Sequence, residues 1–290
     1  MMMNQQMLKL VLRQQENEIT EHFVYRQLAA ATKDGHNRDI LQHIASDELR
    51  HYGVLRKYTN KDIVPRKWEV WKYYLFARFL GLNFSLKLME GGEGMAQKNY
   101  AKLVSVIPEA EQIIRDEGQH EQKLIGTLHE EKLTYVGSIV LGLNDALVEL
   151  MGTLAGLTLA LQDTRVVAIA GIITGIAASF SMGASEYLST KAEGTQKHPF
   201  RAALYTGLAY IVTVTLLVAP YLFFHSPYVA LLVTVVTAII IIAVFNFYIS
   251  VAKDLSFRKR FFEMTTLSLS VAALSFGIGY VVRIVFDLEI

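Results

Sequence analysis

The sequence predicts an all-α protein of two units: a four-helix bundle over residues 1–132, then a five-helix transmembrane domain over residues 133–290. Charge density supports this division. Residues 1–132 hold 19 Lys and Arg with 18 Asp and Glu, whereas residues 133–290 hold only 9 of each kind. Long apolar runs occur in the second part, and the first part shows helical patterning with few strand signals.

The composition excludes several classes of function. A formal net charge of +1 provides no field that attracts a polyanion, so nucleic acid is not an expected partner. The absence of cysteine excludes disulfides, zinc ribbons, iron–sulfur clusters and thiol chemistry. Any bound metal therefore needs carboxylate, imidazole or thioether ligands. Residues 1–15 do not resemble a signal peptide, so we expect the first unit to stay in the cytoplasm.

Four helical stretches are expected in the first unit. Asp34 and Gly35 form a turn signal, Pro65 blocks helix in a linker, and Pro108 suits a first helical turn. Residues 71–89 are apolar enough to suggest a sixth span, but Lys72 and two further basic residues within them favour a buried or interfacial helix. The expected helices are Asn4–Thr32, His36–Tyr58, Trp68–Val106 and Pro108–Lys132.

A repeated Glu-x-x-His pattern carries the chemistry of this unit. It occurs once in the second helix and once in the fourth, and three residues along a helix bring the two side chains onto one face. A single copy arises often on solvated helix faces. Two copies, each after a helix with a central acidic residue, match the ligand set of dimetal carboxylate proteins. The expected metal ligands are Glu18, Glu48, His51, Glu90, Glu93, Glu117 and His120.

The spacing between acidic residues and tyrosines, together with an extra carboxylate, makes residues 5–130 resemble rubrerythrin-like members of the ferritin superfamily. Glu18 precedes Tyr25 by seven residues, as Glu93 precedes Tyr100, and Glu90 adds an extra carboxylate. The resemblance implies two iron ions, or iron and manganese, held by the seven residues named above. Lack of cysteine removes the usual electron route of a rubrerythrin peroxidase. We interpret Glu21, Asp47, Asp116 and Glu121 as solvated or as supporting the ligands, and His22, His36, His43 and His129 as surface residues.

The second unit contains five apolar runs long enough to cross a bilayer, for which about 20 residues are needed. Buried helices of a soluble protein are the alternative, but five such runs in series favour membrane spans. Seven basic residues follow spans two and four, against two on the opposite side, so we expect the N-terminus inside and the C-terminus outside. The expected spans are Tyr135–Leu161, Val166–Ser189, Ala202–Phe224, Tyr228–Val251 and Met264–Phe286.

Polar residues inside the first two spans form the candidate transport path. Carboxylates within a membrane are costly and indicate function, whereas a thioether favours softer metal ions over magnesium or calcium. Met182 alone is more often a packing residue, and Glu186 lies near enough to the end of its span to reach water. The expected path residues are Asp145, Glu149, Met182 and Glu186. Gly152 with Gly156, and Gly171 with Gly175, have the spacing that lets membrane helices approach closely.

The runs GLNDALVELMGTLAGL and ASFSMGASEYLSTKAE resemble the first two helices of the vacuolar iron transporter family, of VIT1/CCC1 type. The resemblance implies a dimeric five-helix domain that moves Fe²⁺ or Mn²⁺ out of the cytosol against protons, with Asp145 and Met182 in the path. The loop after span two is shorter and more basic than the metal-binding segment of plant members. Together the two units resemble membrane-bound ferritin-type iron exporters. The alternative is a ferroxidase or peroxidase that the spans tether to the cell membrane.

Overall fold

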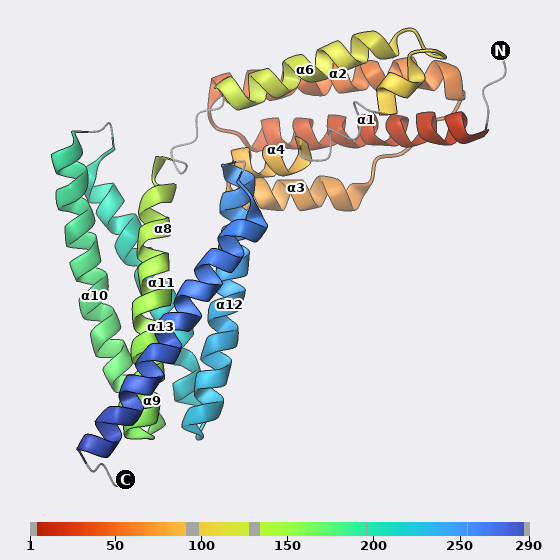
Figure 1. The fold of residues 1–290 in the computed structure, drawn as a ribbon. Coiled ribbons are helices and arrows are strands. Elements are labelled where there is room, and N and C mark those ends of the chain that lie inside the picture. The colour runs from red at the N-terminus through yellow and green to blue at the C-terminus, as the bar shows by residue number, and fades with distance from the viewer. Residues whose placement is uncertain (1–4, 91–98, 128–133, 195–196, 254, 287–290) are drawn as a thin grey trace. The chain divides into compact units, whose positions relative to one another are not determined.

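The computed structural model describes residues 5–90, 99–127, 134–194, 197–253 and 255–286, and every element within these ranges is helical (Figure 1). The chain divides into two compact units, residues 1–130 and 131–290. The predicted boundary between residues 132 and 133 lies outside the described residues.

The first unit begins with a hairpin of two long helices. The Asp34 carboxylate accepts a hydrogen bond of 2.8 Å from the backbone N–H of Asn37, which caps the second helix. That helix ends where Asn60 takes the left-handed conformation, with φ of 51°. The helices of this unit are α1 Gln5–Ala31, α2 Gly35–Thr59, α3 Lys67–Leu80, α4 Leu82–Glu90 and α6 Ala110–Thr127.

The predicted single helix Trp68–Val106 is wrong, because α3 and α4 meet at a sharp reversal. Gly81 separates them with φ of 104° and ψ of 154°, a conformation that side chains with a Cβ rarely adopt. The Ser85 hydroxyl donates to the Tyr73 carbonyl at 2.8 Å, and the rings of Phe76 and Phe84 meet edge to face at 6.0 Å. The later residue of α4 therefore contacts the earlier residue of α3, which shows that the two helices are antiparallel.

This break also removes the suspected sixth span. At 14 residues α3 is too short to cross a bilayer, and α4 is shorter still. The residues that the structure describes contain five helices of sufficient length and apolarity, all in the second unit.

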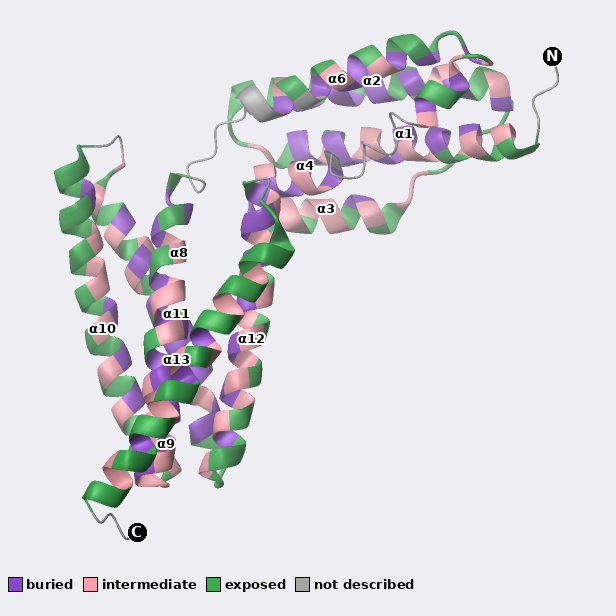
Figure 2. Cartoon of the chain, in the orientation of Figure 1, coloured by how far each residue is buried: buried purple, intermediate pink, exposed green. Residues whose placement is uncertain are grey.

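Two apolar clusters form the core of the first unit, with a polar layer between them. Along α1, for example, Val11 belongs to one cluster, Glu18 to the polar layer and Val24 to the other cluster. The same sequence of layers occurs along α2 and α6, and Figure 2 shows the buried sides of α1 and α2 facing each other. Packing on both sides fixes the helices that carry the polar layer.

The second unit contains the five long helices that the sequence predicts. The first span is interrupted by a π-helical turn, η1, which directly follows Asp145. The last helix begins seven residues before the predicted start at Met264, because a basic helical turn precedes its apolar run. The spans are α8 Val136–Asp145 with η1 Ala146–Leu150 and α9 Met151–Leu161, then α10 Thr164–Glu193, α11 Pro199–Phe223, α12 Pro227–Ala252 and α13 Phe257–Val285.

Glycines set the close approaches between these helices. A Cβ added at Gly156 would lie 2.9 Å from the Ser275 carbonyl of α13, and one at Gly175 would lie 2.5 Å from a Val214 methyl of α11. Gly152 and Gly171 leave similarly little space. The predicted role of the two glycine pairs in close helix packing is confirmed.

Candidate metal centre and intramembrane carboxylates

Five of the seven predicted metal ligands gather in the polar layer of the first unit. One ligand atom from each of four of them lies within 4.8 Å of the other three; these four are Glu18, Glu48, His51 and Glu117. All five residues are at most 6% exposed. They are Glu18 of α1, Glu48 and His51 of α2, and Glu117 and His120 of α6.

Glu48 and Glu117 each reach both histidines. The Oε2 atom of Glu48 lies 3.5 Å from His51 Nδ1, and its Oε1 atom lies 3.2 Å from His120 Nδ1. Glu117 repeats this arrangement, with one oxygen 3.5 Å from His51 Nδ1 and the other 3.9 Å from His120 Nδ1. Two carboxylates that divide their oxygens in this way are suited to bridge two metal ions.

The other ring nitrogen of each histidine contacts an aspartate from the opposite motif. His51 Nε2 lies 3.1 Å from the Asp116 carboxylate, and His120 Nε2 lies 3.0 Å from the Asp47 carboxylate. A histidine that binds metal through one nitrogen usually donates its other N–H to such a group. Asp47 and Asp116 therefore support the histidines, one of the two roles the sequence left open. Arg50 contacts both aspartates, at 2.9 and 2.8 Å.

The inward-facing atoms fit a metal ion better than they fit one another. Glu18 Oε2, Glu48 Oε2, His51 Nδ1 and His120 Nδ1 are buried, and none makes a hydrogen bond to a described residue, although each lies 3.2–3.5 Å from an oppositely charged group of the cluster. Buried polar atoms without partners cost about 1–3 kcal/mol each. Oxygen and imidazole donors together suit iron or manganese. A cation bound between Glu18, Glu48 and His51 would satisfy three of these atoms, and His120 Nδ1 would need a second ion.

Burial also changes the proton affinity of this cluster. Burial, together with the neighbouring Glu48 carboxylate, raises the pKa of Glu18 to about 7. Burial alone would lower the pKa of His120, but its contacts with Glu48 and Asp47 outweigh that effect and raise the pKa. In the absence of a cation, protons compensate the charge of the carboxylates, so metal and protons compete for the same atoms.

Tyr100 is a functional candidate that the sequence indicated only through its spacing. Its buried hydroxyl donates a hydrogen bond to the Glu18 carboxylate. Burial and this carboxylate raise the pKa of Tyr100, which keeps the hydroxyl protonated. Glu93 and the side chain of Glu90 lie outside the described residues, so their predicted role as ligands stays a prediction.

In the membrane unit, Asp145 immediately precedes the π-helical turn and Glu149 lies within it. Asp145 is half-buried, and Glu149 is exposed on the surface of the chain. The Tyr210 hydroxyl of α11 lies 3.5 Å from the Glu149 carboxylate and can donate to it. Single π-helical turns inside helices occur frequently at functional sites, because they rotate the following side chains relative to the preceding ones.

Met182 and Glu186 lie on one face of α10. The Ser138 hydroxyl of α8 donates to the Glu186 carboxylate at 2.6 Å, so Glu186 faces the first span. Met182 is half-buried and packs against the core of the unit. Among the described residues of this unit, three or more acidic or histidine side chains do not gather closely enough to hold one ion. The four predicted path residues therefore lie on two spans, with Asp145 and Glu149 on the first and Met182 and Glu186 on the second.

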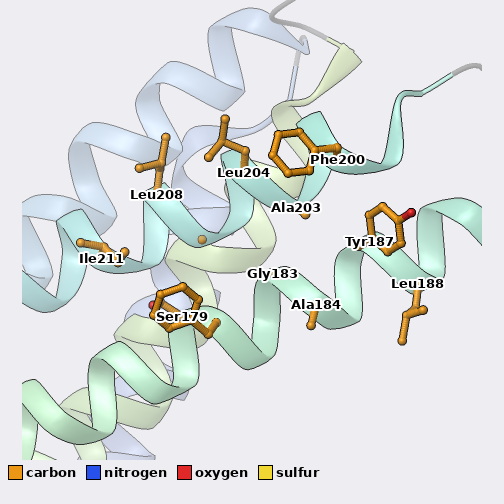
Figure 3. Close-up of a pocket in the computed structure, with 12 residues that line it drawn as sticks. Ser179, Gly183, Ala184, Tyr187, Leu188, Phe200, Ala203, Leu204, Leu208 and Ile211 are labelled. Carbon is orange, nitrogen blue, oxygen red and sulfur yellow. The ribbon is translucent and has the colours of Figure 1, made fainter.

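A groove between α10 and α11 lies beside this segment (Figure 3). Its volume is about 530 Å³, and its walls are almost entirely apolar. Ser179 and Tyr187 contribute the hydroxyl groups of the lining. Such a surface suits hydrocarbon rather than a cation.

One comparison bears on this segment. Residues 136–196 match the model of the VIT family. No curated protein matches the chain. The VIT match covers α8, η1, α9 and α10, the helices that carry all four predicted path residues. Together with the five long apolar helices, it supports a multi-pass membrane protein with a metal transport domain. The match does not include the first unit, whose ferritin-like character stays a prediction.

Proposed function

We propose that this protein exports Fe²⁺, with Mn²⁺ as a second cargo, from the cytoplasm across the cell membrane in exchange for protons. The observation that carries the proposal is the VIT match over residues 136–196, because it covers the spans that contain the intramembrane carboxylates. A carboxylate is costly to place inside a membrane span, and a helix that served only as an anchor would not need one.

Asp145 is the central residue of the proposed path. It is half-buried at the point where α8 gives way to the π-helical turn, about 15 Å along the span from its start. A carboxylate there can balance a divalent cation and can take up a proton once the cation has left. Glu149 extends the path along the span, Met182 provides a thioether that favours transition metals, and Glu186 lies where α10 faces α8.

The exposure of Glu149 supports a homodimer. A carboxylate on the outer surface of a membrane helix would otherwise face hydrocarbon, at a cost of about 2.5 to 3.5 kcal/mol on insertion scales. A second copy placed against this surface would remove the carboxylate from lipid and would complete a path between two chains.

The first unit is proposed as a ferritin-like dimetal domain that captures or senses cytoplasmic iron. Glu18 and His51 would hold one ion, His120 with Glu90 or Glu93 the other, and Glu48 and Glu117 would bridge them. When bound, such a pair of ions supplies a site that can exchange electrons with oxygen species. The chain itself excludes water, orients both histidines through Asp47 and Asp116, and keeps the Tyr100 proton beside Glu18.

A membrane-anchored ferroxidase or peroxidase is the second candidate function. The observation that favours it is the buried cluster of the first unit, where a protonated tyrosine hydroxyl lies against a candidate ligand. In that case the second unit would serve mainly as a tether, and Asp145 would have no role.

Metal movement in proteoliposomes separates the two functions. Full-length protein is reconstituted under an imposed proton gradient, and Fe²⁺ and Mn²⁺ fluxes are followed with a metal-sensitive dye. Asp145→Asn should abolish transport, because the amide neither balances the cation nor takes up a proton. Asp163→Asn is the matched control: that residue caps α10, and asparagine can cap it equally well. Glu48→Ala with Glu117→Ala should remove metal from the first unit yet leave transport at saturating Fe²⁺.

The outcomes are distinct. Transport by Asp145→Asn at the rate of the control would contradict the proposed path. An absence of transport in every form, with oxidation of Fe²⁺ that disappears in the double variant, would favour the anchored oxidase.

A further inference from the structure

The exposed face of α3 is apolar and aromatic, although the helix lies outside the five spans. Exposed fractions are 75% for Trp68, 55% for Trp71, 40% for Leu75 and 74% for Phe79. These positions, at 100° per residue, fall within an arc of about 80° around the helix axis. Figure 2 shows exposed and half-buried positions along α3, while Val70 and its neighbours pack into the unit. An aromatic stripe of this kind is unusual on a surface that meets only water.

Basic residues border this stripe on both sides. Lys72 lies on one side of the arc, and Lys67 and Arg78 lie on the other. The two nearby acidic residues have cationic partners of their own: Glu69 lies 3.2 Å from Arg66, and Asp62 lies 2.7 Å from Arg56. The surface therefore combines apolar rings with a surrounding positive charge.

We propose that α3 is an interfacial helix, whose aromatic stripe enters the headgroup region of the bilayer while its basic border contacts anionic lipids. Tryptophan and tyrosine prefer that region, and lysine and arginine side chains extend from it toward phosphates. The same chain carries five helices long and apolar enough to cross a bilayer, so the first unit is tethered to a membrane. Charge complementarity favours a lipid surface over a second copy of this chain, whose α3 would present the same positive border.

Contact between α3 and the bilayer would also fix the position of the candidate metal centre. An interfacial α3 would keep the helices that carry Glu18, Glu48 and Glu117 next to the membrane surface. This inference does not depend on which metal the protein moves or on whether it moves one, since it needs only the five membrane helices.

The chain contains its own probe for this contact. Trp68 and Trp71 are its two tryptophans, so intrinsic tryptophan fluorescence reports on α3 alone. Full-length protein is reconstituted in vesicles of phosphatidylcholine and phosphatidylglycerol, with and without lipids brominated near the headgroup end of the chains. Brominated lipids should reduce tryptophan emission by about half or more, and aqueous iodide should have little effect. Trp68→Phe and Trp71→Phe then show which ring lies in lipid.

Charge reversal tests the basic border. Lys67→Glu, Lys72→Glu and Arg78→Glu together should lower quenching by brominated lipid at least about twofold, and so should the replacement of phosphatidylglycerol by phosphatidylcholine. The matched control reverses Lys9, Lys33 and Lys57, three exposed lysines of the same unit outside α3, and should behave as the unmodified protein. Circular dichroism and metal content verify that each variant is folded.

Two results would overturn the inference. Strong iodide quenching without quenching by brominated lipid would place the stripe in water. Protection from both quenchers would mean that protein, such as a second copy, covers the stripe.

Discussion

Each histidine of the candidate metal centre contacts an aspartate that immediately precedes the other Glu-x-x-His motif. Asp116 precedes Glu117 in the sequence but contacts His51 of α2, and Asp47 precedes Glu48 but contacts His120 of α6. Arg50 of α2 contacts both aspartates and so links α2 to α6. This crossed arrangement directs both Nδ1 atoms inward, so the two predicted histidine ligands already have the orientation that a metal ion would require.

The proton affinity of Glu18 predicts a pH-dependent metal site. Its pKa is raised to about 7 in the folded protein, so the proton-bound, metal-free form is favoured at low pH and loses that stabilisation as the pH rises through 7. Metal binding must displace this proton. Lowering the pH from 7.5 to 6 should therefore weaken Mn²⁺ binding to the first unit by about tenfold.

Isothermal titration calorimetry on the full-length protein in detergent measures this effect. Mn²⁺ is suitable because it does not oxidise under these conditions. Titrations in buffers of different ionisation enthalpy count the protons released, and more protons per chain should be released at pH 6 than at pH 7.5. The double variant Glu48→Ala with Glu117→Ala corrects for binding elsewhere. Equal affinity at both pH values, with no proton release, would contradict the prediction.

At the scale of the helix, glycine decides where elements bend and how closely they pack. Gly81 permits the reversal between α3 and α4, and Gly279 lets α13 touch the backbone of α9. A Cβ added at Gly279 would lie 2.2 Å from the Gly156 carbonyl oxygen, which cannot move without the helix. A Cβ added at Gly277, on the same helix, would meet no atom within 4 Å among the described residues.

This pair of glycines gives a matched prediction. Gly279→Ala should destabilise the membrane unit by about 1–3 kcal/mol, because α9 and α13 must separate. Gly277→Ala should be neutral or stabilising by up to about 1 kcal/mol, because alanine favours helix more than glycine does. Thermal unfolding of both variants in the same detergent compares them directly. Equal midpoints would show that α9 and α13 do not pack through Gly279.

At the scale of the whole molecule, the basic residues predict how the chain crosses the membrane. Seven of them follow spans two and four, and two lie on the other side, so the N-terminus and the loop near Gly194 should be cytoplasmic. A reporter fused after Ile290 should be active outside the cytoplasm, and one inserted beside Gly194 should be active inside. Both reporters on the same side would indicate an even number of spans.

The sequence by itself determined the features that repeat along one helix. Apolar runs of sufficient length predicted all five membrane helices, and the three-residue spacing in each Glu-x-x-His motif placed a carboxylate and an imidazole on one face. Both patterns depend only on helix geometry, so neighbouring residues suffice to reveal them.

Only the tertiary structure decided which side chains from different helices meet. The crossed contacts of Asp47 and Asp116, the Tyr100 hydroxyl on Glu18 and the exposure of the α3 stripe all depend on residues distant in sequence. The reversal at Gly81 was missed for a related reason. Apolar periodicity continues through both α3 and α4, so the pattern predicts one long helix. The backbone conformation of Gly81 divides it into two antiparallel helices, and that conformation cannot be read from apolar periodicity.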